Sequence, residues 1–245
     1  MMAFVLALSL LVQSDPAPVK DSTANEALDR FKTAYKSKDV AERSAAATEL
    51  AKTPHDKVVA KLGALLLVDD MTVRIAAAKG LGGTQGDLRK KAVNALSRAF
   101  PANAEQPLVV VACVEAMETM QDGMGYAVLR ANLKVPDVQT SKASIEAMNL
   151  IRDKSFVAPL IEWARFLEAA SREATNVGPN GRTVTGGGMI PGGGTVGDPE
   201  APRRARILVP LVHKALESIT KQNFKSMNEW AEWWRKNEAD FKPAK

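Results

Sequence analysis

Apolar residues recur along this chain with the period of an α-helix, and the helical segments follow one another in pairs. The residues from Asp39 to Ala51 return 31 residues later as Asp70 to Gly82, with an arginine four positions after each aspartate. This offset is about the length of one helix–turn–helix unit, which cannot bury its apolar face alone. The sequence therefore predicts an all-α fold in which about five antiparallel helix pairs stack as an α-solenoid, closed by a C-terminal capping helix.

Start and stop signals divide the chain into these pairs. We expect the first helices of the pairs at residues 24–36, 58–68, 87–100, 124–133 and 155–175. Their mates are expected to begin at Asp39, Asp70, about residue 106, Asp137 and Ile207, and the capping helix after Ser226. Residues 23–225 thus form the repeats, with a glycine-rich insertion at 176–200, and residues 226–245 form the capping helix and tail.

Several of these helix starts carry a recognisable capping signal. Asp39, Asp70 and Asp137 can each accept hydrogen bonds from the first free N–H groups of the helix that follows. Thr23 with Glu26, and Ser226 with Glu229, have the spacing of a capping box, and Thr53 before Pro54 is a further start signal. The arginine of the repeat is replaced by Val110 in the third copy and by Ser141 in the fourth.

The first residues differ from the rest of the chain. Residues 3–12 are an apolar run, too short for a membrane-spanning helix of ~20 residues, and small residues surround Ser14. This pattern predicts a signal peptide at residues 1–14, cleaved near Ser14, and export to the periplasm or medium without stable membrane insertion afterwards. A misassigned start codon or a short membrane-seeking tail is the alternative, because no Lys or Arg precedes the apolar run. Residues 15–22 are Pro-rich and are expected to be a flexible lead-in.

Composition limits the function only weakly. The net charge of +5 and the pI near 9.3 permit an anionic partner, but the charges are spread over most of the predicted helices. The single cysteine, Cys113, stands in an apolar stretch and is expected to be a buried, inert thiol rather than a reactive or intermolecular one. His55 and His213 are far apart and have no metal-ligand spacing, so we expect no metal, no cofactor and no enzymatic activity.

The repeated segments resemble HEAT repeats, whose second helix reads Asp-x-x-Val-Arg-x-x-Ala-x-x-x-Leu-Gly. The second copy fits this pattern well, and the first copy fits it in part. The tail resembles the closing segment of some bacterial secreted HEAT proteins through Trp230, Trp233 and Trp234. The resemblance covers residues 24–240 and implies a right-handed α-solenoid, usually a scaffold or protein-binding module, with no particular chemistry. It also implies that Arg43 and Arg74 support stacking between repeats.

Three groups of residues are candidates for a particular role. Asp39 with Arg43, and Asp70 with Arg74, place opposite charges on one helix face and are expected to be structural. The i, i+3, i+4 spacing of Trp230, Trp233 and Trp234 predicts a cap on the last repeat rather than a ligand cage.

The candidates for partner binding lie in and after the glycine-rich insertion. The favoured interpretation of the insertion is a disordered segment between two helices; in the alternative, a small hairpin, Met189 and Ile190 would form the apolar tip. The cations Arg182, Arg203, Arg204 and Arg206 would attract an anionic partner, unless Asp198 and Glu200 neutralise them or water simply solvates them. We therefore expect a non-catalytic scaffold that binds another protein or a peptide. Binding of nucleic acid or another polyanion on a basic face is the less favoured alternative, because export argues against it.

Overall fold

The computed structural model describes residues 19–121, 123–175 and 200–242. Within these ranges the protein is all-α, with eleven α-helices, one short 3-10 helix and no β-strand. The helices are α1 (Asp21–Ala34), α2 (Val40–Leu50), α3 (Asp56–Val68), α4 (Met71–Gly82), α5 (Leu88–Ala102), α6 (Pro107–Met120), α7 (Met124–Asn132), α8 (Val138–Ile151), η1 (Lys154–Phe156), α9 (Val157–Thr175), α10 (Ala201–Thr220) and α11 (Met227–Asn237).

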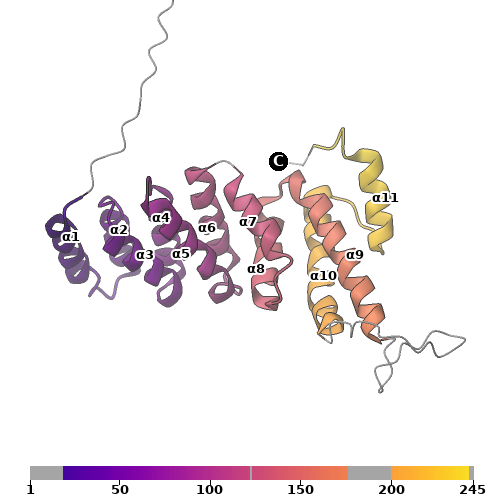
Figure 1. Ribbon diagram of the computed structural model, residues 1–245, viewed down its shortest axis with the longest axis horizontal. Coiled ribbons are helices and arrows are strands. Elements are labelled where there is room, and N and C mark those ends of the chain that lie inside the picture. The colour runs from indigo at the N-terminus through magenta and orange to yellow at the C-terminus, as the bar shows by residue number, and fades with distance from the viewer. Residues whose placement is uncertain (1–18, 122, 176–199, 243–245) are drawn as a thin grey trace, which may run out of the picture.

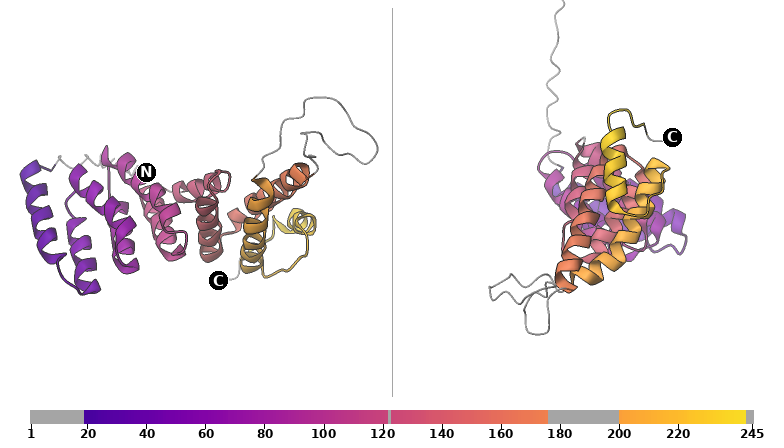
Figure 2. Two further views of the ribbon diagram at one scale, coloured as in Figure 1. Left: turned by 90° about the horizontal axis from the view of Figure 1, so that it is seen from below. Right: turned by 90° about the vertical axis from the view of Figure 1, so that its right-hand side faces the viewer.

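The helices follow one another along the long axis of the molecule from α1 to α8, and α10 and α9 lie side by side between α8 and α11 (Figure 1). The even-numbered helices form a continuous series of contacts, in which α2 packs on α4, α4 on α6, α6 on α8, and α8 on α10. Helix α3 lies between α1 and α5 in the same manner, and α11 packs on α9. The left view of Figure 2 shows the row of helices from below, and the right view looks along the row from the C-terminal end.

One apolar core extends along the whole row. It includes Phe31 near one end, Leu66 and Met117 in the middle, and Phe156 and Trp230 towards the other end, each at most 3% exposed. Because the helix pairs share this core with their neighbours, each pair buries apolar area on both sides. None of the helices in the described ranges is both long and apolar enough to cross a membrane.

Glycines bring neighbouring helices into close contact. A Cβ added to Gly82 at the end of α4 would lie 3.0 Å from Cα of Ala116 on α6. A Cβ on Gly125 of α7 would lie 2.5 Å from the carbonyl oxygen of Val114. Both distances are shorter than a comfortable van der Waals contact, so the backbones approach as they do only because a side chain is missing.

Most of the predicted helix starts are confirmed. The carboxylates of Asp39, Asp70 and Asp137 each accept a hydrogen bond from a backbone N–H of the next helix. Ser226 and Glu229 form a complete capping box at the start of α11. These side chains satisfy N–H groups that would otherwise lack a partner at the start of each helix.

Three predicted starts are wrong. Helix α1 begins at Asp21 and its N-cap is Lys20, so the capping box expected from Thr23 does not form, because Thr23 already lies inside the helix. His55, rather than Thr53, caps α3: its backbone is extended, and its Nδ1 accepts a hydrogen bond from the Lys57 N–H at 3.2 Å. Helix α10 begins at Ala201, six residues before the expected Ile207, since a proline without an N–H fits its first turn.

Candidate binding site

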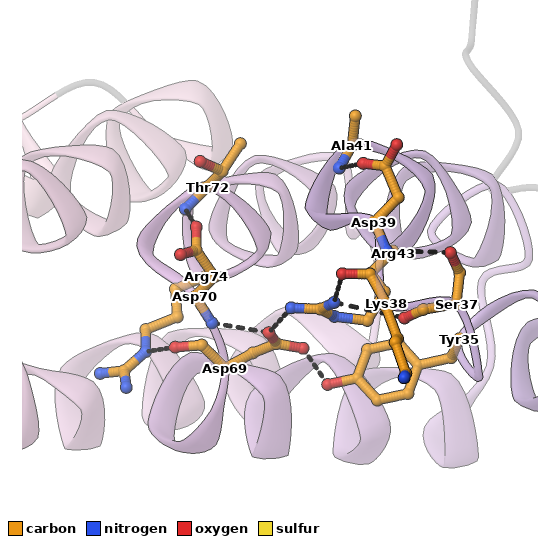
Figure 3. A network of polar contacts seen from close by, with 10 residues as sticks. All are labelled: Tyr35, Ser37, Lys38, Asp39, Ala41, Arg43, Asp69, Asp70, Thr72 and Arg74. Carbon is orange, nitrogen blue, oxygen red and sulfur yellow. Dashed lines mark hydrogen bonds and ion pairs between the residues drawn. The ribbon is translucent and has the colours of Figure 1, made fainter.

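The residues of the repeated motif connect neighbouring helix pairs. The Arg43 guanidinium on α2 donates to the Asp69 carboxylate at 3.0 Å, and the Tyr35 hydroxyl donates to the other oxygen of the same carboxylate (Figure 3). Asp69 caps the end of α3, so it belongs to the next pair. Asp39, four residues earlier, caps its own helix by accepting from the Ala41 N–H at 2.7 Å, and Arg43 reaches across to the next pair.

This network shifts three pKa values, and the hydrogen bond to Asp69 raises that of Arg43. Burial alone would raise the pKa of Asp69, but the hydrogen bonds from Arg43 and Tyr35 favour the carboxylate, and the net result is a lowered pKa. Burial and the hydrogen bond to Asp69 raise the pKa of Tyr35 to about 12. At neutral pH the carboxylate is therefore charged and the phenol is a donor, which is the state that the network requires.

The second and fourth copies also use this position for hydrogen bonds within the fold. Arg74 donates through Nε to the carbonyl of Asp69 at 2.6 Å and through Nη1 to the buried Asn103 side chain at 2.8 Å. Ser141, which replaces the arginine in the fourth copy, donates to the Asn132 carbonyl at 3.1 Å. Arg74 and Ser141 each bind the chain that leads into their own helix, as Arg43 does through the Lys38 carbonyl at 3.0 Å. The motif residues thus act within the fold.

The tryptophans of α11 pack against the preceding helices. Trp230 is 1% exposed, and its indole N–H donates to Nδ1 of His213 on α10 at 3.2 Å. Trp234 is also buried, whereas Trp233 is only partly buried and touches the ring of Phe241. Two members of the predicted stripe therefore belong to the core.

The arginines after the insertion do not form one cluster. Arg203 is exposed and pairs with Glu200 at 3.1 Å, which partly fulfils the expected neutralisation. Arg206 lines a shallow depression between α9 and α10. Only Arg204 faces an aromatic surface: its guanidinium lies 5.6 Å from the centre of the Trp163 ring. The other predicted members, Arg182, Met189 and Ile190, lie outside the described residues, as does the predicted signal peptide.

Arg204 belongs to a groove between the end of α7, one face of α9 and the start of α10. The groove has a volume of about 730 Å³, within the range of about 300–1,000 Å³ that ligand sites occupy. Its lining combines aromatic, aliphatic and charged side chains: Arg130, Ala131, Leu133, Lys134, Pro159, Glu162, Trp163, Phe166, Leu167, Ala170, Ala201 and Arg204.

The difference in length between α7 and α9 helps to explain why this face is open. Helix α7 has 9 residues and α9 has 19. At 1.5 Å per residue they are roughly 14 Å and 29 Å long, so α7 can cover only part of its neighbour. Trp163 is 5% exposed, but Phe166, one turn further on, is 58% exposed. The two rings stack with centroids 5.2 Å apart, so the buried ring supports the exposed one.

The charges in the groove are unequal. Arg130, Lys134 and Arg204 contribute three cations, and Glu162 contributes one carboxylate. Each cation is at the end of an element: Arg130 in the last turn of α7, Lys134 just after it, and Arg204 near the start of α10. The groove therefore offers positive charge beside an aromatic face.

The sequence prediction missed most of this site. It contained Arg204 but not Arg130, Lys134, Trp163 or Phe166. A signal was present in α9, where Trp163 and Phe166 stand at i and i+3 and extend the apolar stripe further than one core face needs. No local signal connects them to Arg130, because the connection is made by packing.

The remaining candidate residues have structural surroundings. Cys113 is fully buried, and burial raises the pKa of its thiol to about 12, so the thiolate is not formed at neutral pH. His55 is half-buried, with Nε2 3.3 Å from the Asp21 carboxylate. In the described part of the chain, no group of three His, Cys, Asp or Glu side chains is placed to hold a metal ion.

No protein-family model matches the chain, and no curated protein is significantly similar to it. The resemblance to HEAT repeats therefore rests on the motif residues themselves, chiefly those of α2 and α4. The fold and the groove are the remaining basis for assigning a function.

Proposed function

We propose that this protein is a non-catalytic scaffold that binds another protein or a peptide in the groove between α7, α9 and α10. The observation that carries this proposal is the lining of the groove, where the exposed Phe166 lies beside Arg204 and the buried Trp163. Aromatic residues and arginine are the side chains most enriched where proteins bind one another.

The architecture in this proposal is a right-handed α-solenoid of the HEAT type. Three observations support it. Helices α2, α4, α6, α8 and α10 contact one another in series, and the Asp and Arg positions repeat. The third is the hydrogen bond from Arg43 to Asp69, which connects one helix pair to the next. Arrays of this kind expose an extended surface that suits protein ligands. In the same proposal α11 is the cap: it packs on α9, and its buried Trp230 is hydrogen-bonded to His213 of α10.

The proposal also includes export. The apolar run at residues 3–12 and the small residues around Ser14 support a signal peptide that is removed near Ser14. Expression of the full chain in a bacterium, followed by cell fractionation and intact mass measurement, tests this part separately. A periplasmic product that lacks residues 1–14 supports export, and a full-length cytoplasmic product contradicts it.

Selection from a displayed library of random peptides tests the groove. The purified chain serves as bait, and each enriched peptide is then synthesised and tested against three variants. Phe166→Ser removes the exposed ring, Arg204→Ala removes the cation over Trp163, and Arg203→Ala is the matched control, since Arg203 is adjacent in sequence but exposed and paired with Glu200.

We expect the enriched peptides to bind the wild type and Arg203→Ala equally, and to lose at least about tenfold in affinity with Phe166→Ser, the loss typical of a hot-spot residue. Unchanged far-ultraviolet circular dichroism and melting temperature would show that the variants are folded. Peptides that bind all three variants equally, or a selection that enriches none, would contradict the proposal.

A further inference from the structure

We infer that the groove recognises an acidic segment of its partner, in which an aspartate or glutamate stands beside an aliphatic or aromatic residue. This inference rests on the proposed function, because it names the kind of partner that the same groove binds. It is carried by the three cations and the aromatic face that α7, α9 and α10 bring together.

The charge balance favours a carboxylate. Among the described residues that line the groove, Arg130, Lys134 and Arg204 are cations and Glu162 is a carboxylate, so this lining has a net positive charge. Complementary charge raises the rate of encounter and excludes partners of the wrong sign. Arg204 is also preorganised: its guanidinium lies over the Trp163 ring, and a planar guanidinium held in this way loses less freedom when it binds a carboxylate.

The apolar face of the groove specifies the neighbour of that carboxylate. Phe166 is 58% exposed and is one of the largest apolar side chains that the described residues leave in water. Pro159, Leu167 and Ala170 extend this face along the same side of α9. An aliphatic or aromatic side chain of the partner would cover Phe166 and gain the free energy of removing both surfaces from water.

The same observations favour a peptide over a nucleic acid. A single-stranded nucleic acid needs exposed aromatic faces on which successive bases stack. Trp163 is only 5% exposed and already contacts both Phe166 and Arg204, so the groove offers one open ring instead of a series.

Fluorescence anisotropy with defined peptides tests the inference. The probes are a fluorescein-labelled peptide with two aspartates between a leucine and a phenylalanine, its twin with two asparagines, and a labelled oligothymidylate. Each is titrated with the full chain, with Arg204→Ala and Lys134→Ala, and with the matched control Arg203→Ala.

We expect the aspartate peptide to bind the wild type about tenfold tighter than its asparagine twin, as one charge-assisted hydrogen bond would provide. Arg204→Ala should remove most of this preference and leave the binding of the asparagine twin unchanged, whereas Arg203→Ala should behave like the wild type. The preference should also weaken as salt is added.

Equal affinity for the two peptides, or no binding of either, would overturn the inference. So would tight binding of the oligothymidylate that Arg204→Ala abolishes, which would indicate a nucleic-acid site. These failures can be separated from failure of the proposed function. If the library selection yields peptides that depend on Phe166 but carry no acidic residue, the groove is a peptide site and only the acidic preference is wrong.

Discussion

The two halves of this protein hold their helices together by different means. From α1 to α6, small residues meet at the helix crossings, as Gly82 does with Ala116, and polar side chains such as Arg43 connect one pair to the next. From α7 to α11, large aromatic side chains dominate, and all four tryptophans of the chain lie after residue 160. The first half uses Arg43 and Arg74 to connect its helices, and the second half places Arg130, Lys134 and Arg204 in a groove beside the exposed ring of Phe166.

The difference shows where a repeat array can acquire a binding site. In the first half, Arg43 and Arg74 are occupied by Asp69 and Asn103, so a ligand would have to displace contacts that stabilise the fold. In the second half, the shorter side chain of Ser141 stands at the arginine position and binds the Asn132 carbonyl. The cation Arg130, which lies nearby, lines the groove. The tryptophans also make the comparison measurable, because their fluorescence reports on the second half while circular dichroism reports on the whole chain.

The largest effect is expected from Trp230→Ala. Trp230 is almost fully buried and is bonded to His213, so its removal leaves a cavity that should cost about 4 kcal/mol. Urea unfolding should show the tryptophan fluorescence transition at lower denaturant, while most of the circular-dichroism transition stays in place. Trp233→Ala, at a partly exposed position, is the control and should cost clearly less. Equal effects of the two substitutions would show that α11 is not anchored through Trp230.

Asp69→Ala should act on the other half. It removes the acceptor that Arg43 and Tyr35 share, and we expect a loss of about 2 kcal/mol, since hydrogen bonds to a charged group are worth more than neutral ones. Asp39→Ala removes only a helix cap and should cost about 1 kcal/mol. Here the circular-dichroism transition should move before the fluorescence transition. If the Asp69→Ala and Asp39→Ala variants have the same free energy of unfolding, the shared carboxylate does not stabilise the first half as described.

Gly82→Ala tests the close packing of the first half. A Cβ at this position would lie 3.0 Å from the Ala116 backbone. We expect this clash to cost more stability than the higher helix propensity of alanine adds, so the free energy of unfolding should fall by about 1 kcal/mol. Gly83→Ala is a matched control, because the nearest atom to its added Cβ is 3.7 Å away. Thermal melting of the two variants should therefore separate them, and identical melting temperatures would contradict this account of the α4–α6 contact.

The smallest effect is a pH dependence of the second half. Burial lowers the pKa of His213 below its ordinary value near 6.5, with Glu168 opposing the shift. The folded state therefore binds this proton less well than the unfolded state. The stability that neutral His213 contributes is fully present above pH 6.5 and is lost as the pH falls through the lowered pKa. Protonated His213 also cannot accept from Trp230.

The fluorescence-detected melting temperature should accordingly fall between pH 7.5 and 5.5, and His213→Gln should reduce this fall. His55→Gln in the first half is the control and should leave the fluorescence-detected slope as it is in the wild type. A slope that is unchanged by His213→Gln would show that another group titrates.

Local features of the fold could be predicted from the sequence with good accuracy. The caps at Asp39, Asp70, Asp137 and Ser226 were correct, because a cap depends on residues only two or three positions away. The start of α10 was misplaced by six residues, since its arginine-rich beginning has no side-chain cap and only a proline to announce it. Contacts over longer distances could not be predicted from the sequence: Arg43 stands four residues after Asp39, yet it binds Asp69, which is 26 residues away.

The sequence by itself determined that the chain forms paired helices, where most of them begin, and which positions repeat. Those properties follow from hydrogen bonds and apolar spacing within a few residues. Only the tertiary structure decided that Arg43 binds Asp69, and that the end of α7 and the start of α10 meet one face of α9. The groove exists because Arg130, Trp163 and Arg204, each more than 30 residues from the next, meet where three helices pack, and no local pattern encodes that meeting.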